Sequence, residues 1–215
     1  GAIGKHMDKK QERVIVKEST TTTTVVATPV AAPVAAPVEE TTTTMGIEAA
    51  TIAIAKHHGP VYLRFGRPTV PNFTDADQKF EIGKAVMLSE GTDVTIIATG
   101  HLVWKAIEAG EQLFAKGISA EIINIHTIKP LDDDAILKSV AKTKCVVTAE
   151  EHQMNGGLGD SIAQLLSRKM PMPQEFVAVN DSFGESGTPD QLMVKYGLDT
   201  VNIITAVEKV MARKK

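Results

Sequence analysis

The chain has 215 residues, of which 43% are hydrophobic and 4% aromatic, and it carries a formal net charge of −3 at pH 7. This charge gives no electrostatic reason to expect nucleic acid or an acidic membrane surface as a partner, and no run of apolar residues reaches the roughly 18 that a membrane-spanning helix needs. The single cysteine, Cys145, excludes an internal disulfide and a multi-cysteine metal site. We therefore expect a protein of the reducing cytoplasm, with Cys145 buried as a small apolar side chain.

Residues 1–46 differ in composition from the rest of the chain. They begin with GAIGKHM, which resembles a cloning remnant and lacks the parts of a secretion signal, and they continue into a Thr/Ala/Pro/Val tract. In that tract the unit Pro-Val-Ala-Ala repeats from Pro29 to Pro37. A proline at every fourth position prevents a regular helix and removes donors that a sheet needs. We predict a disordered tether without chemistry of its own.

Regular structure is predicted from about residue 47. Apolar residues along 47–58 indicate one face of a helix that Gly59 ends, and PVYLRF at 60–65 has the composition of a strand. The following stretch, to about residue 80, is rich in turn-forming residues and is predicted to be an irregular connection.

Beyond residue 81, apolar strands alternate with amphipathic helices. The predicted strands are 93–100, 120–128, 145–151 and 175–180, and the predicted helices are 101–117, 131–143, 158–170, 188–197 and 200–215. This alternation is typical of right-handed βαβ crossovers, and continuous apolar strands are typical of a parallel sheet covered on both faces. We therefore predict that residues 81–215 form an open α/β domain.

Polar side chains follow three of the predicted strands, at the sheet edge where open α/β domains bind ligands. They are His101 after the first, His126, Lys129 and Asp132–Asp134 after the second, and Glu150, Glu151 and His152 after the third. Each histidine stands alone, without the short fixed spacing that makes a pair of metal ligands specific. The three aspartates begin a helix, where negative charge is favoured, and Asp132 fits a helix cap. Structural or interface roles are favoured over a metal or acid–base site.

Three glycines in MNGGLGDS (154–161) open the next predicted helix. Free backbone N–H groups at a helix start can bind an anion. The spacing is neither G-x-G-x-x-G nor that of a P-loop, which also needs a lysine followed by Ser or Thr. A tight turn and close backbone packing explain these glycines more simply.

Two arginines, Arg64 and Arg67, lie at the end of the predicted strand in GPVYLRFGRP. A guanidinium there can hold a phosphate through two hydrogen bonds. An ion pair with a surface carboxylate is the alternative, and the spacing alone leaves both open.

Four stretches carry a resemblance to a known family: ATIAIAKHHGPVYLRFGRPTVPNF, GTDVTIIATGHLVWKAIEAGEQLFAKGISAEIINIHTIKPLDDDAI, VVTAEEHQMNGGLGDSIAQLL and NDSFGESGTPDQLMVKYGLD. From about Ala49 to the end the chain resembles the C-terminal part of transketolase, most closely the type that is split into two subunits. Deoxyxylulose-phosphate synthase and the beta subunits of two-oxo-acid dehydrogenases share this domain. The stretch ESGTPDQLMVKYGL favours transketolase among them.

The resemblance implies a thiamine-diphosphate-dependent transferase that moves a two-carbon ketol unit between sugar phosphates in the pentose phosphate pathway. In that family an N-terminal domain with a Gly-Asp-Gly motif binds the diphosphate and Mg²⁺ or Ca²⁺, and a glutamate of a middle, pyrimidine-binding domain activates the cofactor. Neither motif occurs in this chain, and residues 47–80 match only the end of the middle domain. Arg67 matches the arginine that contacts the substrate phosphate.

The C-terminal domain of the family is an open, mostly parallel five-stranded sheet with helices on both faces. It lies away from the thiamine and serves dimer contacts and stability. The resemblance therefore implies an N-terminal subunit and a second copy as partners, and we expect this chain alone to bind no cofactor and to lack activity. A stand-alone binding or scaffolding module is the alternative.

Overall fold

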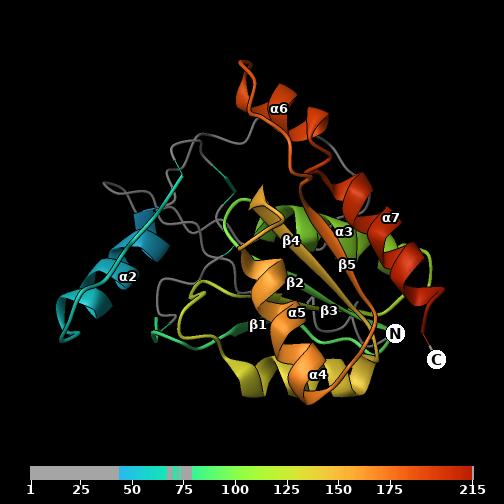
Figure 1. Ribbon diagram of the computed structural model, residues 1–215, viewed down its shortest axis with the longest axis horizontal. Coiled ribbons are helices and arrows are strands. Elements are labelled where there is room, and N and C mark those ends of the chain that lie inside the picture. The colour runs from blue at the N-terminus through green and yellow to red at the C-terminus, as the bar shows by residue number, and fades with distance from the viewer. Residues whose placement is uncertain (1–43, 67–69, 72, 74–78, 215) are drawn as a thin grey trace, which may run out of the picture. The chain divides into compact units, whose positions relative to one another are not determined.

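The computed structural model describes residues 44–66, 70, 71, 73 and 79–214 (Figure 1). Residues 1–43 of the predicted tether, most of the predicted irregular connection and Arg67 lie outside the described residues, whereas residues 44–46, predicted to be disordered, begin a helix. The chain divides into two compact units, with the boundary between Ile82 and Gly83. None of the helices in the described part of the chain is both long and apolar enough to span a membrane.

The first unit contains one described helix, α2 (Thr44–Ala55), which confirms the helix predicted there. Ala50 is the one buried residue among those described in this unit. The strand predicted at 60–65 is wrong, because these residues adopt no regular secondary structure. A strand needs a neighbour to satisfy its backbone N–H and C=O groups, and the described residues of this unit include no strand that could pair with it. The β-forming composition of residues 60–65 is therefore not sufficient to make them a strand.

The second unit is built on a five-stranded sheet with the order β1-β3-β2-β4-β5. Its strands are β1 (Val86–Ser89), β2 (Val94–Ala98), β3 (Ala120–Asn124), β4 (Val146–Gln153) and β5 (Gln174–Val179). Strands β2 to β5 are parallel to one another, and β1 lies antiparallel to β3 at the edge. The predicted mostly parallel α/β sheet is confirmed. The four strands expected from the residues themselves are all present, whereas β1 was not expected from its sequence.

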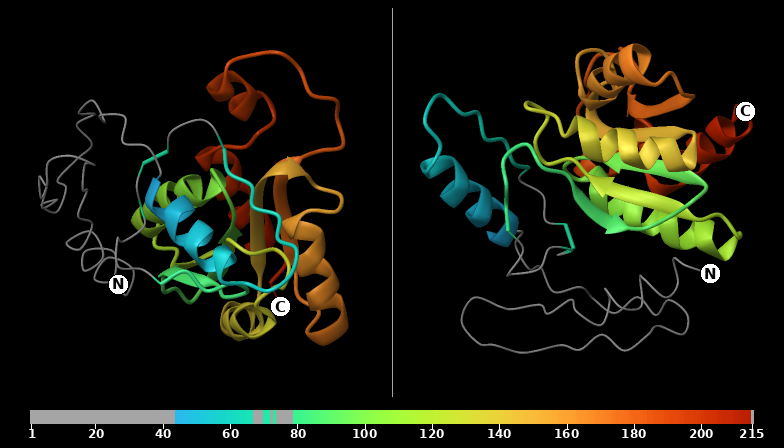
Figure 2. Two further views of the ribbon diagram at one scale, coloured as in Figure 1. Left: turned by 90° about the vertical axis from the view of Figure 1, so that its left-hand side faces the viewer. Right: turned by 90° about the horizontal axis from the view of Figure 1, so that it is seen from below.

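Helices cover both faces of the sheet, as Figure 2 shows. These helices are α3 (Leu102–Ala115), α4 (Asp133–Thr143), α5 (Leu158–Lys169) and α7 (Thr200–Met211), and a short further helix, α6 (Pro189–Lys195), has no buried residue. On one face α4 and α5 pack a cluster of buried aliphatic side chains against the strands, including Ile97, Ile136 and Ile162. On the other face α3 contacts α7 and the sheet. Every residue of β2 is buried, as expected for a central strand covered on both sides.

Candidate functional site

The carboxyl edge of the parallel strands gathers the polar residues that the sequence marked. His101 follows β2, and His126 follows β3. Strand β4 continues to Gln153, so Glu150, Glu151 and His152 belong to the strand itself. Since β2 and β4 are parallel neighbours with Ala98 opposite Ala149, their carboxyl ends lie side by side.

The side chain of His101, just after β2, contacts that of Glu151 in β4. The distance from Nδ1 of His101 to Oε2 of Glu151 is 2.7 Å, and the two side chains are 18% and 20% exposed. Gly100 precedes the histidine at φ 58°, a left-handed conformation that favours glycine. A Cβ on Gly100 would lie 3.7 Å from Oε1 of Glu151. The pair therefore joins the β2–α3 turn to β4.

Glu150 lies next to this pair but points into the protein, and it is 2% exposed. Its Oε2 accepts a hydrogen bond from the backbone N–H of Leu158 at 2.9 Å, and its Oε1 accepts one from Gly159 at 2.8 Å. Both N–H groups lie in the first turn of α5, where no helical partner exists for them and where the helix dipole favours a negative charge. The anion bound at this helix start is the protein's own carboxylate.

Two glycines of the same turn allow close packing, and one of them, Gly157, makes room for that carboxylate. A Cβ on Gly157 would lie 2.2 Å from Oε2 of Glu150, and a Cβ on Gly159 would lie 2.5 Å from the ring of Phe176. The N–H of Gly156 donates to Oδ2 of Asp160 at 2.7 Å. The interpretation of MNGGLGDS as a turn with close packing is confirmed. We did not predict that Glu150 supplies the carboxylate, although a glutamate at the end of an apolar run, six residues before Gly156-Gly157, was the available signal.

Two of the remaining predicted polar residues, His126 and Asp132, have structural partners. Nδ1 of His126 lies 2.9 Å from Oγ1 of Thr127, and burial lowers the pKa of this histidine. Asp132 caps α4, as predicted: its Oδ1 accepts from the N–H of Ala135 at 3.3 Å and its Oδ2 from the N–H of Ala85 at 2.9 Å. Within the described ranges, no group of three or more His, Cys, Asp or Glu side chains is arranged to hold a metal ion. The edge holds pairs and caps, and the geometry supports no metal centre there.

Cys145 is buried, as predicted. Burial raises the pKa of its thiol; nearby Lys214 acts in the opposite sense, and Asp93 adds to the rise. A thiol with a raised pKa and no exposed surface is a poor nucleophile, so Cys145 has the inert role that its apolar neighbours indicated.

The fold does not test phosphate binding by Arg64 or Arg67. Arg64 is exposed in the irregular segment after α2, whereas Arg67 lies outside the described residues. Two surface depressions in the second unit, of about 190 and 280 Å³, are smaller than typical ligand pockets, and no predicted site residue lines either one. Phosphate binding by Arg67 therefore stays a prediction.

Residues 83–203 match the family model described as "Transketolase, C-terminal domain". The chain is 44% identical over 168 residues to the 6-deoxy-6-sulfo-D-fructose transketolase subunit of Clostridium sp. (strain MSTE9), covering 78% of this chain and 52% of that protein. It is 41% identical over 164 residues to a putative transketolase C-terminal section of Methanocaldococcus jannaschii, covering 75% and 51%. It is 36% identical over 163 residues to 1-deoxy-D-xylulose-5-phosphate synthase 1 of Geobacter sulfurreducens, covering 74% and 25%.

A solved structure titled "Split gene transketolase, inactive beta4 tetramer" is also similar to this chain, with a TM-score of 0.74 and 44% sequence identity, covering 78% of this chain and 56% of that one. The chain spans about half the length of the curated transketolase relatives that it matches. The family match lies on the unit that carries the five-stranded sheet. Through this unit the chain belongs to the transketolase family, as a carrier of its C-terminal domain.

Proposed function

We propose that this chain supplies the C-terminal part of a split, thiamine-diphosphate-dependent transketolase, and that this part maintains the assembly and does not catalyse. The carrying observation is the burial of Glu150 at the start of α5. At the sheet edge where an open α/β domain would bind an anionic ligand, the chain has placed its own carboxylate. The names of the relatives support the enzyme class.

The described residues do not fit thiamine diphosphate. A diphosphate needs free backbone N–H groups or basic side chains, and its divalent cation needs clustered oxygen ligands. The N–H groups of Leu158 and Gly159 already donate to Glu150, and the described part of the chain offers no metal-ligand cluster. In this proposal the cofactor and its Mg²⁺ or Ca²⁺ are held by the N-terminal subunit and the middle domain of the intact enzyme.

Arg67 is the proposed contribution of this chain to substrate binding. Two relatives are named for sugars with a terminal anion: one for 6-deoxy-6-sulfo-D-fructose and one for apulose 4-phosphate. A guanidinium binds phosphate and sulfonate oxygens with the same geometry. We propose that Arg67 holds the terminal anionic group of a sugar phosphate, as in the pentose phosphate pathway, or of a related sulfo-sugar.

Self-association is the other part of the proposal. The 44%-identical solved structure is named a beta4 tetramer and is called inactive. We propose that this chain likewise associates with copies of itself, and that ketol transfer requires the N-terminal subunit in addition.

A domain graft tests the proposed function. Residues 49–215 would replace the matching segment of the Clostridium subunit, and ketol transfer would be measured after mixing with that enzyme's other subunit. We expect the hybrid to assemble and to transfer the ketol unit, because the graft keeps the middle domain of the host except for its end. A folded hybrid that assembles with neither itself nor the partner subunit would contradict the proposal.

The same hybrid tests Arg67. Arg67→Gln is expected to raise the KM of the anionic sugar at least tenfold with a smaller change in kcat, because the lost contact is made in both the ground state and the transition state. Arg64→Gln is the matched control, and equal effects of the two variants would contradict the specific assignment.

A further inference from the structure

The segment from Asp181 to Lys195, which we call the arm, leaves the end of β5 and contains α6. Every residue from 181 to 191 is exposed, and no residue of α6 is buried. In Figure 1 α6 projects beyond the sheet, next to the start of α7. The arm therefore contributes almost nothing to the core of its own domain.

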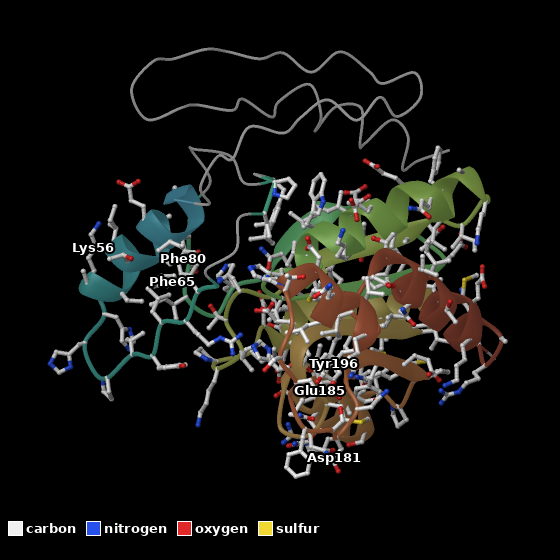
Figure 3. The ribbon with its side chains drawn as sticks, turned by 90° about the horizontal axis from the view of Figure 1, so that it is seen from above. Lys56, Phe65, Phe80, Asp181, Glu185 and Tyr196 are labelled. Carbon is white, nitrogen blue, oxygen red and sulfur yellow. The ribbon has the colours of Figure 1, made fainter. Side chains whose placement is uncertain are left out.

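The arm is nevertheless held in one conformation by polar contacts. Thr188 and Gln191 form a reciprocal capping box, with the N–H of Gln191 donating to Oγ1 of Thr188 at 3.4 Å and the N–H of Thr188 donating to Oε1 of Gln191 at 3.1 Å. The hydroxyl of Tyr196 donates to the carbonyl oxygen of Phe183 at 3.0 Å, and Lys195 pairs with Glu185. Figure 3 labels Tyr196 and Glu185. Ordering a segment without burying it is unfavourable in isolation. A surface ordered in advance binds a partner at a smaller loss of entropy.

The arm exposes apolar groups surrounded by negative charge. Phe183 is 97% exposed, and Val194 is 68% exposed. The arm contains three carboxylates and one lysine, which gives it a net charge of −2: Asp181, Glu185, Asp190 and Lys195. A fully exposed phenylalanine on a braced segment has the properties of an interface anchor, since aromatic side chains in a desolvated contact carry a large share of binding energy.

A surface of opposite charge occurs in the first unit, at residues 56–66. This segment, KHHGPVYLRFG, contains Lys56 and Arg64 but no carboxylate, so its net charge is +2 with neutral histidines. It also exposes apolar side chains: Val61 is 45% exposed, Tyr62 85% and Phe65 61% (Figure 3 labels Lys56 and Phe65). The arm and the 56–66 segment therefore carry opposite net charges, and both expose apolar side chains.

We infer that the arm of one copy docks on the 56–66 segment of a second copy. The inference rests on the proposed self-association and assigns the surfaces that produce it. Contact between two arms is disfavoured because like charges would meet, whereas the arm and the 56–66 segment attract each other. Such a contact can be made twice in a two-fold dimer, with the arm of each copy on the 56–66 segment of the other; made only once per pair of copies, it closes in a ring.

Sedimentation equilibrium of the full chain at low ionic strength tests this. We expect the wild type to associate, and Phe183→Ser to raise the dissociation constant at least tenfold. Val201→Ser is the control, because Val201 is also a largely exposed apolar residue, at 67%, but it lies on α7, outside the arm. Both substitutions change exposed side chains, and unchanged circular dichroism and melting would show that the fold is retained.

A charge exchange tests the pairing itself. Lys56→Glu and Asp190→Lys are each expected to raise the dissociation constant of self-association. The variant that carries both is expected to recover at least half of this change in the logarithm of the dissociation constant. A monomeric wild type would contradict the proposed self-association and this inference together. A wild type that associates while Phe183→Ser associates equally well would overturn the arm assignment alone, and so would a double variant that is weaker than either single variant.

Discussion

Replacing Glu150 by glutamine tests the physical core of the site. The substitution keeps the size of the side chain but turns one carboxylate oxygen into an amide NH₂ group. In the structure the two oxygens accept from the N–H groups of Leu158 and Gly159 at 2.9 and 2.8 Å. A glutamine can satisfy one of these donors, and its NH₂ group then faces the other.

The expected loss follows from these two contacts. A hydrogen bond to a charged group contributes about 1.5–3 kcal/mol, and leaving a buried donor unsatisfied costs about 1–3 kcal/mol. The loss of the charge at the helix start adds a few tenths of a kcal/mol or more. Since the single terms overlap, we expect Glu150→Gln to lower the free energy of unfolding by about 3 kcal/mol and the melting temperature by roughly 10 °C.

Urea unfolding monitored by circular dichroism measures this loss. Glu90→Gln is the matched control, because Glu90 is exposed and its replacement is expected to change stability by less than about 0.5 kcal/mol. Gly157→Ala is expected to give a loss similar to that of Glu150→Gln, because the new Cβ would lie 2.2 Å from Oε2 of Glu150. If Glu150→Gln unfolds with the stability of the wild type, the carboxylate is not the internal anion of the α5 turn.

Three further outcomes are expected from single positions. Gly91→Ala should destabilise the chain by more than about 3 kcal/mol in urea unfolding, because its Cβ would lie 2.2 Å from the backbone of Ala120. In the control, Gly46→Ala, the new Cβ meets no atom within 4 Å and should have little effect. Similar stabilities of the two variants would contradict the packing argument. Because burial lowers the pKa of His126 in the folded state, the unfolded chain takes up this proton first. The free energy of unfolding should therefore fall as the pH drops from about 6.5 through the lower folded pKa; His126→Gln should flatten this part of the pH profile, and an unchanged slope would refute the assignment. Cys145 should react with a thiol reagent at pH 8 only after unfolding, because burial raises its pKa and covers it; rapid reaction of the native chain would show that it is accessible.

Local signals in the sequence were sufficient for most of the second unit. Helix α4 was predictable because Asp132 stands where a cap is needed and apolar residues follow at helical spacing. Strand β2 was predictable because all of its residues are apolar or β-branched. Strand β1 has only four residues with a mixed burial pattern and pairs antiparallel at the sheet edge, so neither its length nor its composition distinguishes it from a loop. For residues 60–65 the error is the reverse: their composition indicated a strand, but the described residues include no strand that could pair with them.

The candidate site depended more on tertiary contacts. Sequence placed His101 and Glu151 at one edge of the sheet, but their pairing follows from the order of the strands, which puts β4 beside β2. The role of Glu150 requires the turn that brings a helix start back to a residue eight positions earlier. The identification of the family did not depend on either contact, because motif order along the chain carried it.

Titration calorimetry with thiamine diphosphate and Mg²⁺ tests the central claim most directly. We expect no detectable binding by this chain, because the backbone donors at the start of α5 are already satisfied by Glu150 and the rest of the described chain supplies no cluster of metal ligands. Binding of the cofactor at micromolar concentration would contradict the proposal that the cofactor is held entirely by the other parts of the enzyme.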